Sequence, residues 1–180
     1  MTYYGGKELA AAFRTVRKNT IQVAQDIPEN QYGFKAAPEA RSVAQTLTHI
    51  ALGTEIAHQI HGNKIDDLKK LNFPELMQKM GADEAKPRTK AEIVALLQSQ
   101  GEKFASYLEG LPESFLAERV AMPPGAEPSS KSRFEMLLSP KEHEMHHRAQ
   151  LMTLERMIGV VPHLTRQRQE QMARAQSAQR

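Results

Sequence analysis

Seven histidines occur in this 180-residue chain, and three of them fall within the ten residues 141–150. His143 and His147 are four residues apart, so on a helix their side chains lie about 40° apart and can converge on one ion. Neutral imidazole is a common ligand of divalent metals. The spacing therefore predicts a metal site on a helix, with the third histidine, His146, pointing away from the pair.

The surrounding residues place this histidine pair on an apolar helix face. At about 100° per residue, four apolar side chains fall within about 80° of His143; they are Met136, Leu151, Leu154 and Ile158. Two imidazoles in such a stripe cost stability unless they are hydrogen-bonded or bound to a metal. The pattern thus favours a metal over simple core packing.

A third ligand is expected, because three protein ligands with an open position are typical of a catalytic metal site. Three histidines compete for the role, His49, His58 and His61, all in one predicted helix. His58 and His61 lie at the helix end beside Gly62, where histidine often complements the helix dipole. His49 lies nearer the middle of the helix and is our choice.

The run from His143 to His147 also fits H-E-x-x-H, the helix of zinc proteases, in which the glutamate is the general base. The extended form of that motif needs Gly and His where this chain has Gln150 and Thr153, so we interpret the match as chance. Glu144 is then expected in solvent or beside the ligands. Three residues are expected next to the ligands without binding the metal, namely Glu144, His146 and Gln150.

Apolar residues recur at spacings of three and four in four segments, which indicates four helices. They run from about 7 to 27, 42 to 61, 89 to 108 and 131 to 158, with a short helix near 74–80. Thr89 and Glu92 form a capping box, and we see no alternating strand pattern. The sequence predicts an all-α four-helix bundle over residues 1–162, with long connections that permit crossovers. Residues 163–180 form an Arg/Gln-rich C-terminal extension, and the 110–130 connection is expected to line a cleft mouth.

Composition excludes several kinds of function. Without cysteine, the chain has no disulfide and no thiolate nucleophile of its own. No run of 18 apolar residues predicts a membrane span, and no signal-peptide pattern opens the sequence, so a cytoplasmic location is expected. The net charge of +3 resides entirely in residues 163–180, which carry four arginines and one glutamate. A neutral body makes nucleic-acid binding an unfavoured function.

Two stretches resemble the DinB-like family. The first runs from Ile27 to Ile50 and combines a loop, a proline, an Arg-Ser pair and a helix that ends in His-Ile. The second begins at His143 and is similar to the family signature His-x-x-x-His-Arg-Gly-Gln, with Ala149 in place of the usual glycine. The ending Glu155-Arg-Met-Ile-Gly also matches, and the resemblance covers roughly residues 5–162.

The resemblance implies a four-helix bundle, usually a homodimer, with a divalent metal (Zn, Ni or Fe) held by His49, His143 and His147. Related members include thiol-dependent S-transferases and an isomerase. Our first hypothesis is a metal-dependent S-transferase or hydrolase that activates water or a low-molecular-weight thiol on a small-molecule substrate. The alternative is a non-catalytic dimeric binding or scaffold protein with a structural or adventitious metal. A third hypothesis is an arginine tail that docks on acidic partners.

Overall fold

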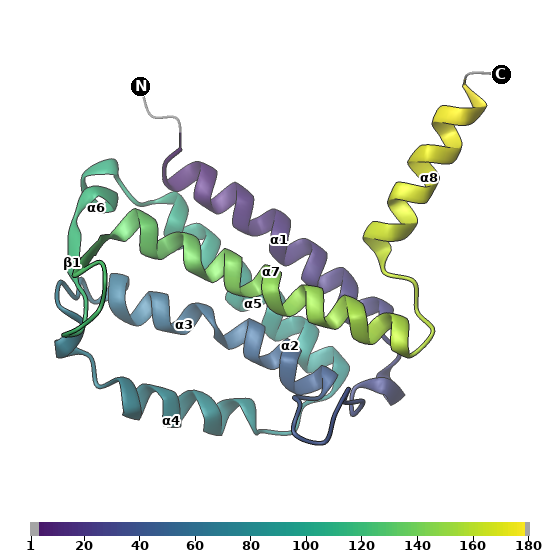
Figure 1. Ribbon diagram of the computed structural model, residues 1–180, viewed down its shortest axis with the longest axis horizontal. Coiled ribbons are helices and arrows are strands. Elements are labelled where there is room, and N and C mark those ends of the chain that lie inside the picture. The colour runs from purple at the N-terminus through teal and green to yellow at the C-terminus, as the bar shows by residue number, and fades with distance from the viewer. Residues whose placement is uncertain (1–3, 179–180) are drawn as a thin grey trace.

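The computed structural model describes residues 4–178, and four long helical segments lie side by side in it (Figure 1). Helix α1 packs against α5 and α7, and α2 packs against the same two helices. Consecutive segments α1 and α2 therefore lie across a diagonal of the bundle, so the chain crosses over. The expected all-α bundle with crossover connections is confirmed. Its helices are α1 (Gly6–Asp26), α2 (Val43–Leu52), α3 (Thr54–Ala57), α4 (Phe73–Glu84), α5 (Lys90–Glu109), α6 (Glu113–Ala117), α7 (Arg133–Met157) and α8 (His163–Ser177).

Side-chain caps explain where the long helices begin. The Ser42 hydroxyl accepts the backbone N–H of Gln45, and the Gln45 side chain accepts the backbone N–H of Ser42, which caps α2. Thr89 and Glu92 make the expected capping box at the start of α5. Such caps satisfy the backbone donors that a helix leaves free at its first turn.

The second helical segment differs from the expected continuous helix over 42–61. It breaks at Gly53, resumes as α3, and ends in a π-helical turn at His58–Gly62. Glycine is a weak helix former, and a Cβ at Gly53 would lie 3.1 Å from the ring of His143 on α7. The break therefore lies where the His143 ring of α7 meets the second segment.

The connection at 110–130 holds more structure than predicted. It contains α6 and the strand β1 (Arg119–Ala121), which pairs antiparallel with β2 (Ser130–Ser132). The sequence shows no alternating pattern here, because three-residue strands are too short to produce one. Met122, directly after β1, lines a hollow beside His49 and His143, in agreement with the expected cleft mouth. At the N-terminus, Tyr4 packs edge-on against Phe134 with ring centroids 6.0 Å apart.

Two apolar clusters form the core, one at each end of the bundle. Between them lies a buried ion pair in which Arg17 of α1 meets Glu144 of α7 at 2.9 Å. Arg17 also donates to the backbone carbonyl oxygens of Leu97 on α5 and Ile50 on α2. One guanidinium thus joins all four long segments, at the level of the bundle where His49 and His143 lie.

The C-terminal extension forms a helix, α8, that projects away from the bundle (Figure 1). Its first residue, His163, is buried, whereas residues 167–178 are all exposed. Over the described residues, no helix is both long enough and apolar enough to cross a lipid bilayer.

Candidate metal centre

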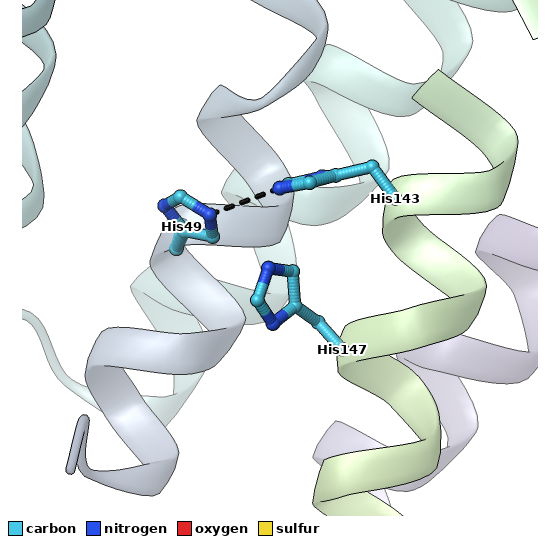
Figure 2. Close-up of side chains that lie close together, drawn as sticks. All are labelled: His49, His143 and His147. Atoms are coloured by element: carbon cyan, nitrogen blue, oxygen red, sulfur yellow. Dashed lines mark hydrogen bonds between the residues drawn. The ribbon is translucent and has the colours of Figure 1, made fainter. Parts of the chain in front are cut away.

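Three histidine rings from two helices point toward one another in the space between α2 and α7 (Figure 2). His49 comes from α2, and His143 and His147 lie one turn apart on α7. Nε2 of His49 lies 3.0 Å from Nε2 of His143, and one potential ligand atom from each of the three rings lies within 4.8 Å of the others. Two nitrogens bound tetrahedrally to one zinc ion lie about 3.4 Å apart, so the rings need only small shifts to share an ion.

Hydrogen bonds at Nδ1, the ring nitrogen that points away from the cluster, orient two of these rings. Nδ1–H of His49 donates to Oε2 of Glu84 over 2.9 Å, and Nδ1–H of His147 donates to Oε1 of Gln150 over 2.8 Å. Both oxygens can only accept, so the proton must sit on Nδ1, and the Nε2 atom of each ring carries a lone pair. Histidines that bind metals typically show this arrangement.

Burial and mutual repulsion keep the rings on α7 uncharged. The pKa of His143 is lowered to about 4, mainly by burial and then by the neighbouring His147 and His49. Burial also lowers the pKa of His147. Both imidazoles are therefore neutral at pH 7, the state in which they can bind a metal. The imidazole donors, their convergence and their neutral state all fit a divalent ion.

The residues expected beside the ligands have three different placements. Gln150 holds His147, as described, and its Nε2 also lies 3.2 Å from Nε2 of His146, so His146 reaches the cluster only through Gln150. Glu144 corrects the expectation: it is buried in the bundle core with Arg17 and, among the described residues, makes no hydrogen bond to a histidine. A carboxylate held there cannot serve as the general base of an H-E-x-x-H motif.

Glu84, at the end of α4, is the site residue that the sequence did not reveal. Its Oε2 accepts from His49, and its Oε1 accepts from Nε of Arg41 over 2.6 Å. The pairing depends on how α4 lies against α2, and no local pattern in the sequence encodes that packing. A carboxylate behind a ligand histidine raises the basicity of the ring and fixes its orientation.

The two histidines that competed with His49 lie elsewhere. The His58 ring faces Tyr107 with centroids 5.2 Å apart. His61 is buried, and its Nδ1 lies 3.3 Å from a guanidinium nitrogen of Arg133. Burial and that cation lower the pKa of His61 to about 4. The structure therefore brings together the three histidines chosen from the sequence, and their binding of a metal stays a prediction.

Two hollows meet the cluster from different sides. One of about 480 Å³ is lined by His49 and His143 and runs along α3 and the first half of α7. The other, of about 750 Å³, touches His147 and Gln150 and lies against the loop that carries Arg41. Both volumes are in the range of small-molecule sites.

The fold and the cluster define a four-helix bundle with a candidate three-histidine metal centre between two of its helices. Residues 12–151 match the family model of the DinB superfamily, and the chain belongs to that superfamily. No curated protein matches the chain in sequence.

Solved structures agree with this assignment of the fold. The chain is similar to YfiT from Bacillus subtilis, described as a probable metal-dependent hydrolase with an unusual four-helix bundle topology, with a TM-score of 0.67, 15% identity, and coverage of 89% of this chain and 91% of that one. It is also similar to a DinB-like protein from Bacillus subtilis (TM-score 0.63, 20% identity, 84% and 92% covered) and to one from Bacillus cereus (0.66, 15%, 86% and 93%). At these identities the likeness establishes the fold alone.

Proposed function

We propose that this protein is a divalent-metal-dependent enzyme that acts on a small molecule, with His49, His143 and His147 as the metal ligands. The observation that carries the proposal is the convergence of these three imidazoles, two of them held from behind by Glu84 and Gln150, beside a hollow of substrate size. Imidazole ligands suit zinc, nickel or iron.

In this proposal the histidines hold the ion, and the ion activates the reacting molecule. The three histidines bind the ion and leave the remaining positions around it open to the two hollows. When bound, a divalent ion supplies Lewis acidity, which lowers the pKa of water or of a small thiol. The chain contains no cysteine, so a thiol would come from a cosubstrate. These features support an S-transferase or a hydrolase, and the description of YfiT agrees with the second.

Metal content of the untagged protein, measured by mass spectrometry, tests the proposal. We expect about one divalent ion per chain after loading with zinc, nickel or iron, and loss of that ion in His49→Ala and His147→Ala. His58→Ala is the matched control, because His58 is also half-buried on the second helical segment but lies outside the cluster. Circular dichroism should show all three variants folded. A wild-type protein that takes up none of these metals would contradict the proposal and favour a scaffold.

A homodimer is the assembly that we propose. Three of the exposed large apolar side chains support it, because they lie at the end of α7, just after it and on α8; they are Met157, Val161 and Met172. Analytical ultracentrifugation is expected to give twice the chain mass, and a monomer at micromolar concentration would overturn this assembly.

A further inference from the structure

The residues that line the hollow beside His49 and His143 show how far it extends from the two rings. It begins at the two rings, follows α3 and the first half of α7, and ends at the β hairpin, where Met122 and Lys131 contribute to its wall. Met80 of α4 contributes to the wall as well. The histidines therefore lie at one end of an elongated space and not in its centre.

The lining of this space is mainly apolar, and its polar side chains are His49, His61, Lys131, Glu135, Ser139, Glu142 and His143. Lys131 pairs with Glu135 at 3.3 Å, so the far rim carries no net charge from this pair. Three of the nine methionines of the chain line the hollow, and methionine adapts to ligands of varied shape. The apolar lining consists of Ile56, Ala57, Ile60, Met80, Met122, Met136, Leu138 and Pro140.

The helices that form the walls are irregular where they border the hollow. Pro140 lies inside α7 and has no N–H, so the carbonyl oxygen of Met136 lacks its usual helical donor. Both residues line the space. Across from them, the second segment breaks at Gly53 and ends in the π-helical turn that contains Ile60. The backbone of both walls is therefore irregular where it borders the hollow.

We infer that this hollow binds the uncharged, apolar body of the substrate and directs its reacting group toward His49 and His143. The inference rests on the proposed function for the identity of the reacting end, whereas the apolar binding itself needs no metal. Molecules that are polar along their whole length, such as sugars and nucleotides, are disfavoured, because they would lose hydration against Ile56, Ile60 and the three methionines, whose side chains donate no hydrogen bonds. The substrate class is therefore a small aliphatic or aromatic molecule with one polar reactive group.

The metal-free protein provides the first test. The probe is N-phenyl-1-naphthylamine, an uncharged dye whose fluorescence rises in apolar surroundings. We expect saturable binding that Met80→Gln weakens by about fourfold or more, which is the effect of one lost apolar contact. Met77→Gln is the matched control, because Met77 is a half-buried methionine on the same helix that does not line the hollow, and it should leave the affinity unchanged. Met136→Gln on the opposite wall is the second variant.

The zinc-loaded protein provides the second test. Straight-chain alkyl hydroxamates should displace the dye, with affinity rising about threefold to fourfold for each added CH₂ group until the hollow is full. Dye binding that neither Met80→Gln nor Met136→Gln weakens would overturn the inference, whether or not zinc binds. Dye binding that both variants weaken, in a protein that takes up no metal, would support the hollow as an apolar site and overturn the proposed metal centre.

Discussion

Glu84 is the single residue whose role behind the metal centre is easiest to isolate. Its carboxylate orients His49 and raises the basicity of the ring, which strengthens the bond from Nε2 to a metal. Glu84→Ala is therefore expected to weaken zinc affinity by about 10- to 100-fold. Glu84→Gln retains an oxygen acceptor and should lose less. Asp83→Asn changes the adjacent carboxylate, which pairs with Lys86, and serves as the control. Competition with a chelating dye measures all three, and wild-type affinity in Glu84→Ala would refute the role.

Arg17 and Glu144 stabilise the bundle as a pair and not as independent charges. Removal of one partner leaves the other buried and uncompensated, which costs about 3–5 kcal/mol. We therefore expect Arg17→Met and Glu144→Met each to lower the free energy of unfolding by that amount. The double variant Arg17→Met/Glu144→Met should lose less than either single variant, because it leaves no buried charge. Urea denaturation measures all three, and additive losses would refute the coupling.

Glu155 is expected to make stability depend on pH. It is fully buried, and neither carboxyl oxygen has a hydrogen-bond partner among the described residues. Burial together with Asp26 raises the pKa of Glu155 to about 7, although Arg166 and Arg156 act to lower it. The folded state thus binds this proton more tightly than the unfolded state, whose pKa is near 4.5. The stabilisation is complete below pH 4.5 and is lost as pH rises through about 7.

Comparison of Glu155→Gln with the wild type isolates this effect. The raised pKa corresponds to about 3 kcal/mol between the two ends of the pH range. Relative to the wild type, the variant should gain that amount of stability between pH 4.5 and pH 8. His163, whose pKa burial lowers from 6.5, titrates in both proteins, so its contribution cancels in the comparison. Denaturation curves at several pH values measure the difference, and a difference that does not change with pH would contradict the prediction.

At the scale of elements, the break between α2 and α3 gives the His143 ring its space. A Cβ at Gly53 would lie 3.1 Å from Nδ1 and Cε1 of that ring. Gly53→Ala should therefore displace the ring and lower zinc affinity several-fold while the bundle stays folded, since alanine favours helix. Gly81→Ala on α4 meets nothing within 4 Å and should raise stability by about 0.5–1 kcal/mol without changing zinc affinity. Equal zinc affinities in the two variants would contradict the steric argument.

Elements whose signals are local were predictable from the sequence. The Thr89 cap and the spacing of the apolar residues predicted the long helices. The four-residue spacing of His143 and His147 predicted that both lie on one face of a helix. Glu144 was misplaced because the histidine face and the core face of α7 differ by one residue, about 100° of rotation. Its partner Arg17 lies 127 positions away, so no spacing rule could pair them. The contact of Glu84 with His49 depends likewise on packing between α2 and α4.

At the scale of the whole molecule, α8 divides into an anchored start and a free remainder. His163 is buried with Nε2 3.3 Å from Oδ1 of Asn19, and Arg166 pairs with Asp26 at 2.6 Å. Residues 167–178 are exposed, and an isolated helix of that length is marginal in water. Residues 163–166 therefore contribute to the stability of the bundle, although the sequence predicted that the bundle domain ends at residue 162.

Two truncations test this division. A chain that ends at residue 167 should retain the melting temperature and zinc uptake of the full chain. A chain that ends at residue 162 loses the contacts of His163 with Asn19 and of Arg166 with Asp26, so it should melt several degrees lower. A loss of about 1 kcal/mol lowers the melting temperature by about 2–4 °C for a protein of this size. Each is compared with the full chain by calorimetry and ultracentrifugation. If the chain ending at 167 becomes monomeric while the full chain is dimeric, the exposed part of α8 forms the dimer contact. Equal melting temperatures for both truncations would show that the anchoring contacts contribute nothing.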